Sequence, residues 1–338
     1  MKQIKGGVTA AKGYEAASTA AGIKYQGRTD MALIYSQVPC VSAGTFTTNV
    51  VKAAPVKWDR QIVDSGAGVQ AVVVNSGIAN ACTGEEGMGY CKETAEAAAK
   101  ALNIDAAGVL VGSTGVIGMQ LPMQKLVDGI QVLAGKKAEG LQSGHDAALA
   151  IMTTDTVEKE MAVEIEIGGK TVTIGGMSKG SGMIHPNMCT MLAFITTDAA
   201  ITKEALQKAL SEDVEDTYNM ISVDGDTSTN DTAILLANGL AGNQEITYAS
   251  PEYETFKEAL HMVNETLAKK MAGDGEGATA LFEVKVVGAE SIKQAKTLAK
   301  SVVCSNLTKA AIAGHDANWG RILCAMGYSG VQFDPEKV

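Results

Sequence analysis

The chain has 338 residues, of which 46% are hydrophobic and 20% are charged, so we expect a packed globular protein with one large or two medium domains. A formal net charge of −10, spread along the chain, argues against nucleic acid or an anionic membrane surface as the main partner. The six cysteines form no CxxC pair and only four histidines are present, so a structural zinc site is not expected. The N-terminus lacks an apolar signal core, and no apolar run reaches the roughly 18 residues that cross a bilayer. The sequence therefore predicts a cytoplasmic protein with reduced thiols.

Apolar β-branched runs predict buried strands, and stretches with apolar residues every three or four positions predict helices between them. In chain order we expect a strand at 69–76, a helix at 87–102, a strand at 109–114, a helix at 121–134, two half-buried strands within 162–174 around a Gly-Gly turn, a strand at 192–198, a helix at 203–220, a strand at 234–239, a helix at 251–271, a half-buried strand at 279–288 and a short helix at 290–302. Because strands and helices are intermixed throughout, we expect a layered α/β (α+β) fold with sheets packed between helices.

The Gly-rich segment 175–186 is the clearest internal boundary, and we interpret it as a flexible connection into the strand at 192–198. Thr190 stands at the entrance of that strand, directly after Cys189. Its hydroxyl can attack the carbonyl carbon of Cys189 and form an ester by an N-to-O acyl shift, and water then releases Thr190 as a new N-terminus. On pattern alone, an ordinary strand threonine behind a plain loop is the commoner case.

An N-terminal threonine is suited to acyl transfer. A threonine hydroxyl needs a nearby base before it acts as a nucleophile. The α-amino group titrates at about 7.7–8.0, close to operating pH, so a single residue can supply both the nucleophile and its base.

The segment KGSGMIHPNMCTML, residues 179–192, resembles the self-cleavage motif of the ornithine acetyltransferase family, in which the Thr of a PNM-x-TML sequence becomes the nucleophile. Further segments match the family in the same order: NSGIANACTG at 75–84, GSTGVIG at 112–118, LPM at 121–123, IMTTDT at 151–156, VDGDTSTNDT at 223–232, GDGEGAT at 273–279, GHDANWGRI at 314–322 and GYSGVQFDP at 327–335. The resemblance covers nearly the whole chain.

This resemblance implies an N-terminal-nucleophile-like, self-processing fold that is cut between Cys189 and Thr190 into an α chain, 1–189, and a β chain, 190–338. It implies an enzyme of arginine biosynthesis that moves an acetyl group from N2-acetyl-L-ornithine to L-glutamate through an acetyl-threonine intermediate. Some family members also use acetyl-CoA as a donor, and no resident cofactor is implied. Two cleaved precursors are expected to assemble as an α2β2 heterotetramer.

The family motifs place the oxyanion hole on Thr114 and Gly115 and the substrate contacts on Thr153, Lys179 and Glu276, with Thr190. A lysine suits the carboxylate of an amino-acid substrate, and a glutamate suits the side-chain amine of ornithine. Without the resemblance, ordinary interpretations remain: a strand-to-helix turn at 114–115, a capping or turn hydroxyl at 153 and a solvent-exposed loop lysine at 179.

Two segments imitate ligand-binding loops. GDGEG lacks the Lys-Ser/Thr of a phosphate loop and carries two acids, and VDGDTSTNDT lacks the ligand order and terminal Glu of an EF-hand. We interpret VDGDTSTNDT as a turn-rich structural segment near the pocket. Cys82 is expected to be a small buried residue, and His185, which stands near the cut, is expected in packing or at the surface.

The sequence departs from the family pattern at two places. Position 189 is Cys where Ala is commoner, but both residues are small. Family members continue beyond GYSGVQFDP into a tail whose Asn and Thr contact substrate, whereas this sequence stops at Val338, so those two positions are not assigned. Two alternatives therefore stay open: a related self-processing amidase or aminopeptidase that transfers the acyl group to water, and a non-catalytic scaffold.

Overall fold

The framework of the computed structural model, which describes residues 1–185 and 191–338, is one continuous β-sheet. Within the described residues the strands run in the order β1-β6-β7-β8-β9-β3-β4-β5, and β2 pairs with β3 beside this path. Their bounds are β1 Lys2–Ile4, β2 Tyr14–Thr19, β3 Met31–Phe46, β4 Val69–Ile78, β5 Val109–Val116, β6 Lys159–Ile167, β7 Lys170–Lys179, β8 Leu192–Thr197 and β9 Thr232–Ala237. The long strand β3 joins the two halves of the sheet, because its residues 31–40 pair with β2 and β4 while residues 41–46 pair with β9.

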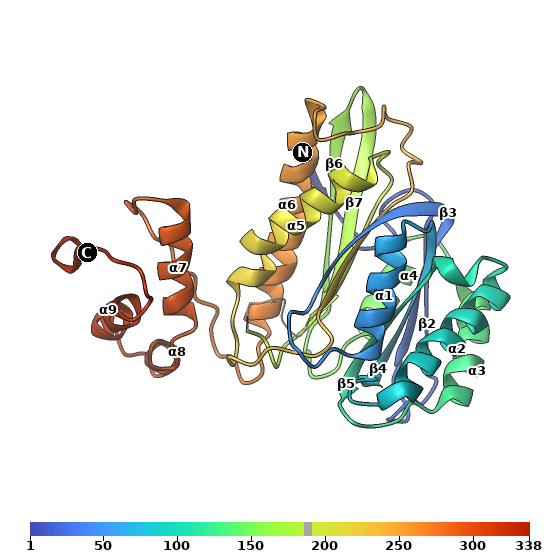
Figure 1. The fold of residues 1–338 in the computed structure, drawn as a ribbon, viewed down its shortest axis with the longest axis horizontal. Coiled ribbons are helices and arrows are strands. Elements are labelled where there is room, and N and C mark those ends of the chain that lie inside the picture. The colour runs from blue at the N-terminus through green and yellow to red at the C-terminus, as the bar shows by residue number, and fades with distance from the viewer. Residues whose placement is uncertain (186–190) are drawn as a thin grey trace.

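Helices cover both outer faces of this folded sheet (Figure 1). The described helices are α1 Ala54–Ser65, α2 Gly84–Leu102, α3 Met123–Lys136, α4 Leu141–Ala150, α5 Lys203–Asp216, α6 Glu252–Gly273, α7 Ile292–Val303, α8 Asn306–Ala313 and α9 Trp319–Gly327, with short 3-10 turns at Ala106–Gly108, Tyr218–Met220 and Pro335–Lys337. Helices α5 and α6 lie on the half that contains β6 to β9, and α2 and α3 lie on the half that contains β2, β4 and β5 (Figure 1). The layer order is therefore helix, sheet, sheet, helix, which confirms the predicted arrangement of sheets packed between helices.

The two halves of the sheet face each other across an apolar core. Phe194 of β8 and Met177 of β7 share this core with Leu110 of β5 and Tyr14 of β2, and each is at most 1% exposed. Gly112 lies directly against Phe194, since a Cβ at that glycine would stand 3.1 Å from the ring. Fully burying each large side chain contributes about 1.5–3 kcal/mol, so this core holds the two halves together.

Helix α6 shows how the outer layers form from the sequence. Its fully buried side chains Phe256, Leu260, Val263 and Leu267 recur every three or four residues and so line one face of the helix. Val263 and Leu267 pack against Gly176 of β7, where the missing side chain leaves room for the helix. The helical period read from the sequence therefore becomes the contact between α6 and the sheet.

Most predicted elements are confirmed. The expected strands correspond to β4, β5, β8 and β9, the expected helices to α2, α3, α5, α6 and α7, and the hairpin to β6 and β7, which turn at Gly168 and Gly169 with φ of 57° and 74°. The strand predicted at 279–288 is wrong: these residues form no strand, and Leu281 and Val287 are 53% and 77% exposed. Alternating apolar residues become a strand only beside a hydrogen-bonding neighbour, and none of the described strands pairs with this segment.

The Gly-rich segment 175–186 differs from its prediction as well. Its first part, through Lys179, is the end of β7 and is buried, so the connection begins only at residue 180. Gly175 is needed for close packing, since a Cβ there would lie 2.1 Å from the carbonyl oxygen of Gly7. The glycines of β7 therefore allow tight packing on both faces of the sheet and do not mark a flexible linker.

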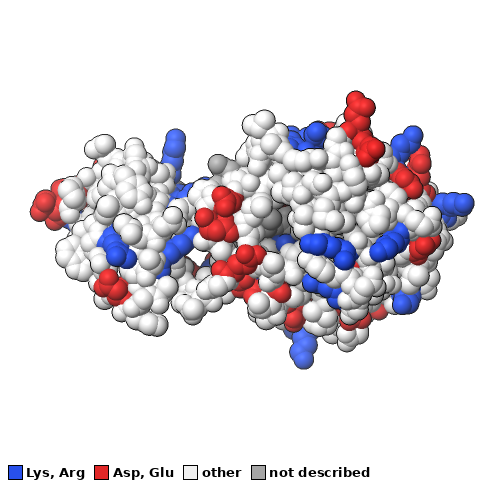
Figure 2. Space-filling model, turned by 90° about the horizontal axis from the view of Figure 1, so that it is seen from below, with Lys and Arg blue, Asp and Glu red and all other residues white. Residues whose placement is uncertain are grey.

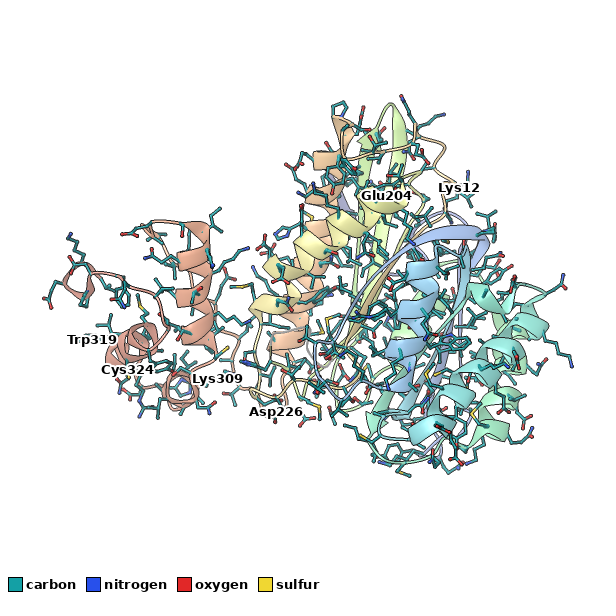
Figure 3. The ribbon with its side chains drawn as sticks, in the orientation of Figure 1. Lys12, Glu204, Asp226, Lys309, Trp319 and Cys324 are labelled. Atoms are coloured by element: carbon teal, nitrogen blue, oxygen red, sulfur yellow. The ribbon has the colours of Figure 1, made fainter. Side chains whose placement is uncertain are left out.

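Helices α7, α8 and α9 form a small body beside the main sheet (Figure 1). Its own buried apolar side chains are few: Leu298, Val302, Ala311 and Ala325. Trp319 and Cys324, both exposed, lie on α9 at a distance from the main body, whereas Lys309 of α8 faces it (Figure 3). This body therefore contributes little to the main core.

The two pieces predicted by the cut at 189/190 are not separate structural domains. Strand β8 lies between β7 and β9, antiparallel to the first and parallel to the second, and β9 pairs in turn with β3. Strands β8 and β9, which follow the predicted cut, therefore lie between β7 and β3, which precede it. No observation tests the division itself, which stays a prediction.

Candidate active site

Three neighbouring strands bring their ends together at one edge of the sheet. Lys179 ends β7 and pairs with Leu192, which starts β8, and Leu192 pairs with Thr232, which starts β9. Lys179 is only 3% exposed. Side chains two residues apart on a strand share a face, so Lys179 lies on the same side as Met177, toward the space between the two halves of the sheet. The alternative interpretation of Lys179 as a solvent-exposed loop lysine is therefore wrong, and the cation is buried at the strand end.

The carboxylate of Asp155 compensates the buried positive charge of Lys179. Its Oδ2 lies 3.9 Å from Lys179 Nζ, and its Oδ1 accepts from Lys159 Nζ at 2.8 Å and from the Gly180 N–H at 2.7 Å. Lys159 is itself 0% exposed and also pairs with Asp274 at 2.6 Å. Two lysines and two aspartates thus form one buried network.

The pKa values of this network show which effect dominates at each group. Burial would raise the pKa of Asp155, but the charges of Lys179 and Lys159 outweigh it and lower the pKa to about 2. Burial lowers the pKa of Lys179, and the Asp155 carboxylate opposes that shift. Asp155 is therefore held as a carboxylate and partly offsets the cost of burying the lysine.

Thr153 and Glu276 meet the same network. The Thr153 N–H donates to Asp155 Oδ2 at 3.0 Å, and the neighbouring Thr154 hydroxyl bonds to Ser181 at 2.7 Å. The Glu276 N–H donates to the Ser181 carbonyl at 2.8 Å, and the Glu276 carboxylate, like that of Asp155, opposes the lowering of the Lys179 pKa by burial. The structure thus brings Thr153, Lys179 and Glu276, three residues named from the sequence, to one place.

Thr114 and Gly115 end strand β5 on the opposite half of the sheet. Thr114 is 5% exposed, and Gly115 has a φ of 131° and packs so tightly that a Cβ would lie 2.2 Å from the Gly77 carbonyl carbon. Glycine is therefore required at 115. Both residues belong to the strand and not to a turn, and their backbone is fixed by packing against β4, which suits a group that must hold its N–H in place.

Asn230 connects this end of β5 to the start of β9. Its side-chain nitrogen donates to the Ser113 carbonyl at 2.8 Å and to the Ala79 carbonyl at 2.7 Å. The Ser113 carbonyl and the Thr114 N–H belong to one planar peptide group and point in opposite directions. Asn230, which is 6% exposed, therefore sets the direction of the Thr114 N–H from across the two halves of the sheet.

Thr190 and Cys189, the predicted nucleophile and cleavage partner, lie outside the described residues. The next residue, Met191, is 2% exposed and begins the path into β8. Its N–H donates to Asp231 Oδ1 at 3.1 Å, and its carbonyl accepts the Thr232 N–H at 3.1 Å. The backbone of Met191 is thus held by hydrogen bonds through both its N–H and its carbonyl.

Sequence reasoning missed four residues of this arrangement: Asp155, Lys159, Asn230 and Asp231. Asp155 lies in the IMTTDT segment, and Asn230 and Asp231 lie in VDGDTSTNDT, so the segments were recognised but not these side chains. A buried charge is invisible in a local pattern, because its partners come from distant positions. Two smaller expectations can be judged: Cys82 is exposed, not buried, because it sits in a turn with φ of 56°, and His185 is half-buried near Ser222 and Cys304, as expected for packing.

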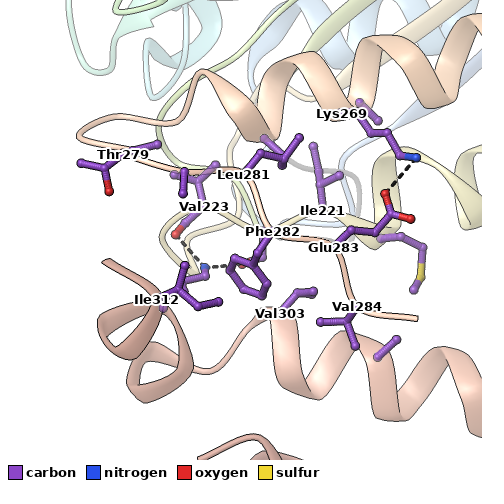
Figure 4. A pocket seen from close by; sticks show the side chains of 18 of the residues that line it. Ile221, Val223, Lys269, Thr279, Leu281, Phe282, Glu283, Val284, Val303 and Ile312 are labelled. Atoms are coloured by element: carbon purple, nitrogen blue, oxygen red, sulfur yellow. Dashed lines mark hydrogen bonds and ion pairs between the residues drawn. The ribbon is translucent and has the colours of Figure 1, made fainter. Parts of the chain in front are cut away.

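A separate apolar cavity of about 440 Å³ lies between α6, the segment after Glu276 and the body formed by α7 and α8 (Figure 4). Its walls include Ile221, Val223, Leu281, Phe282, Val303 and Ile312. Lys309 donates to the Val223 carbonyl at 2.7 Å, and Lys269 pairs with Glu283 at 3.0 Å across its rim (Figure 4). Of the described candidate residues only Glu276 lines it, so the strand-end cluster and not this cavity carries the chemistry.

Charges on the visible outer face are mixed. Basic and acidic side chains alternate over the face seen from below (Figure 2). No described helix is long and apolar enough to cross a membrane.

The layer order places the chain in the N-terminal-nucleophile hydrolase fold class, which a solved structure shares. A solved L-aminopeptidase D-Ala-esterase/amidase from Ochrobactrum anthropi, described as a variant of that fold, covers 80% of this chain and 87% of itself at 12% identity and a TM-score of 0.50. At that identity the likeness concerns the fold alone.

The particular family follows from closer relatives. The ArgJ family model matches residues 15–338, and the chain belongs to the ArgJ family. The arginine biosynthesis bifunctional protein ArgJ of Symbiobacterium thermophilum is 55% identical over 340 residues, covering 100% of this chain and 84% of that protein. ArgJ 1 of Clostridium acetobutylicum is 55% identical over 328 residues, covering 96% of this chain and 79% of that protein.

Two solved structures agree. ArgJ from Bacillus halodurans is 43% identical with a TM-score of 0.53, covering 55% of this chain and 96% of that chain. Ornithine acetyltransferase from Mycobacterium tuberculosis, solved with ornithine, is 44% identical with a TM-score of 0.50, covering 54% of this chain and 95% of that chain.

Proposed function

We propose that this chain is an ornithine acetyltransferase of arginine biosynthesis that moves acetyl from N2-acetyl-L-ornithine to L-glutamate through an ester on Thr190. The observation that carries the proposal is the buried Lys179 at the end of β7, which pairs with Asp155. Strand β7 lies directly beside β8, the strand that follows Thr190 in the chain. Membership of the ArgJ family and the solved ornithine complex of a 44% identical relative support this substrate class.

The enzyme is expected to mature by cutting itself between Cys189 and Thr190. The hydrogen-bonded pairing of β7 with β8 and of β9 with β3 would hold the two pieces together after the cut. The share of this chain that aligns with the solved ArgJ chain from Bacillus halodurans is 55% of 338 residues, about 186. That length is close to one of the two predicted pieces and supports the proposal.

Acetyl transfer then proceeds in two halves. The Thr190 hydroxyl, relieved of its proton by the new α-amino group, attacks the acetyl carbon of N-acetylornithine, and ornithine leaves with a proton on its nitrogen. Glutamate then attacks the ester and regenerates the hydroxyl. Each half-reaction passes through a tetrahedral oxyanion. Thr114 and Gly115 at the rigid end of β5 would supply the hydrogen-bond donors for it.

The substrate contacts follow from charge. The Lys179 ammonium would bind the substrate carboxylate, and Glu276, which is exposed beside Gly182, would bind the side-chain amine of ornithine. Thr153, held through its N–H by Asp155, would present its hydroxyl to the substrate. No resident cofactor is needed for this chemistry, and acetyl-CoA is a candidate second donor.

The deciding experiment is denaturing mass spectrometry of the purified protein. We expect two fragments that meet at 189/190, a single intact chain for Thr190→Ala, and an acetyl adduct on the fragment that begins at Thr190 after incubation with N-acetylornithine. An uncut wild-type chain would refute the proposal. Consumption of N-acetylornithine without glutamate, at the rate seen with it, would favour an amidase of related fold.

Assembly and location are further parts of the proposal. We expect an α2β2 heterotetramer in the cytoplasm, built from two cleaved precursors. Native mass spectrometry should give the mass of two of each fragment, and a single pair would contradict the assembly.

A further inference from the structure

Lys159 joins two acidic side chains that lie far apart in the sequence. Its side chain is 0% exposed, and its Nζ donates to Asp155 Oδ1 at 2.8 Å and to Asp274 Oδ2 at 2.6 Å. A further hydrogen bond goes to the Val157 carbonyl at 3.1 Å. An ammonium has three protons to donate, and all three are used inside the protein. Lys159 therefore has no proton left for a substrate, and what it does is hold Asp155 and Asp274 together.

Each of these carboxylates leads to a residue that the proposed function assigns to the substrate. On one side, Asp155 lies 3.9 Å from Lys179 Nζ, which would bind the substrate carboxylate. On the other side, Asp274 directly follows helix α6 and stands two positions before Glu276, which would bind the substrate amine. The buried ammonium of Lys159 is therefore shared between the two ends of the substrate site.

A second connection between the same two segments runs through the backbone. The Glu276 N–H donates to the Ser181 carbonyl at 2.8 Å, and the Glu276 carboxylate lies against Gly182, where a Cβ would stand 2.4 Å from Oε1. A single hydrogen bond leaves a segment free to turn about it, whereas two separate attachments also fix its direction. The spacing between Lys179 and Glu276 therefore depends on this backbone bond and on Lys159 together.

We propose, on the basis of the acetyl transfer proposed above, that Lys159 is a positioning residue that sets the spacing between Lys179 and Glu276 and so selects the length of the diamino-acid substrate. Ornithine has three methylenes between its α-carbon and its side-chain amine. Lysine has one more, which moves the amine about 1.3 Å farther from the carboxylate, given C–C bonds of about 1.5 Å. A site whose two charged ends are fixed cannot follow that change, and one methylene is worth about 10–200-fold in selectivity.

Removing the ammonium would release the two segments from each other. Asp155 Oδ1 and Asp274 Oδ2 bind the same nitrogen, so they are no farther apart than these two hydrogen bonds laid end to end. Without the cation between them, two carboxylates this close repel each other. The segment that carries Glu276 then keeps only its backbone bond and can shift relative to Lys179. A displacement of about 1 Å is enough to cost a matched substrate about 10²-fold in rate.

Two variants separate this connection from the balance of charge. Lys159→Met removes the ammonium and leaves both carboxylates in place. Lys159→Met combined with Asp274→Asn also removes one carboxylate, so one lysine and one aspartate remain in the network and their charges balance; Asn keeps an oxygen for the Thr156 N–H. Lys137→Met is the control, because Lys137 forms an ion pair with Glu15 at 2.7 Å that joins the end of α3 to β2, elsewhere in the fold.

The measured quantity is the ratio of kcat/KM for N2-acetyl-L-ornithine to kcat/KM for N2-acetyl-L-lysine, with glutamate as the acceptor. A ratio does not depend on how much of the protein is folded or matured, so a loss of stability alone leaves it unchanged. We expect at least about 10 for the wild type and Lys137→Met and below about 3 for both Lys159 variants. For a variant too slow to assay, calorimetry gives the corresponding ratio from the Kd values of ornithine and lysine.

The outcomes separate this inference from the function on which it rests. A wild type that transfers no acetyl from N-acetylornithine to glutamate would overturn the proposed function itself. A wild type that transfers acetyl equally well from both donors would overturn only the fixed spacing, because no length is then selected. Lys159 variants that keep the wild-type ratio would exclude the role given to Lys159. The same holds if only the charge-balanced double variant keeps the ratio, or if Lys137→Met loses it as well.

Discussion

Replacing Asp155 with Asn tests whether the buried lysines depend on this carboxylate. The change keeps the shape of the side chain and removes one negative charge from between Lys159 and Lys179, at 2.8 and 3.9 Å. Lys159 retains Asp274 at 2.6 Å, but within the described residues Asp155 is the one ion-pair partner that Lys179 has. Breaking one member of a buried pair leaves a charge without compensation, which costs about 3–5 kcal/mol.

The pKa of Asp155 gives a second route to the magnitude. Its pKa is about 2 in the folded protein and 3.8 ordinarily, a difference equivalent to about 2 kcal/mol at about 1.4 kcal/mol per pH unit. Because the folded pKa is the lower one, this stability is fully present above about pH 4 and is lost as the pH falls toward 2. The two routes together predict that Asp155→Asn lowers the free energy of unfolding by about 2–5 kcal/mol at pH 7.

Urea titrations at pH 7 and at several values between pH 4 and 2 measure both effects. The wild type should lose stability over this acid range, and the loss for Asp155→Asn should be smaller by about 2 kcal/mol. Asp198→Asn is the control: Asp198 is 4% exposed, accepts one backbone N–H with each oxygen, and has a pKa raised by burial. This variant should lose about 1–3 kcal/mol at pH 7, because one N–H loses its acceptor, but should keep the wild-type loss of stability between pH 4 and 2. Unchanged stability of Asp155→Asn would refute the role given to the network.

Three further changes probe the strand ends and the core. Gly115→Ala puts a Cβ 2.2 Å from the Gly77 carbonyl carbon, so kcat should fall about 10²-fold, whereas Gly135→Ala, with open space around it, should leave kcat unchanged. Lys179→Met removes a buried cation, and KM for N-acetylornithine should rise about 10-fold or more; an unaltered KM would exclude substrate binding by Lys179. Phe194→Ala should lower the free energy of unfolding in urea by about 3–5 kcal/mol, and a loss under about 1 kcal/mol would contradict its central place in the core.

Much of the fold could be predicted because it depends on local pattern. The apolar runs that become β4, β5, β8 and β9 and the helical periods of α2 and α6 are properties of neighbouring residues. The prediction failed at 279–288, where alternation alone cannot supply the strand that must lie alongside. It also misjudged the glycines of β7, because their purpose is contact with Gly7 and α6, which are distant in sequence.

The sequence by itself determined the family and the identity of the candidate residues, since motifs such as KGSGMIHPNMCTML are carried by consecutive residues. Only the tertiary structure decided which of them are buried, charged and paired. Lys159 reaches Asp274 across 115 positions, and Asn230 reaches Ser113 across 117. Such contacts depend on folding the sheet through β3. No local pattern encodes the burial that lowers the pKa of Lys179 and raises the pKa of Asp231.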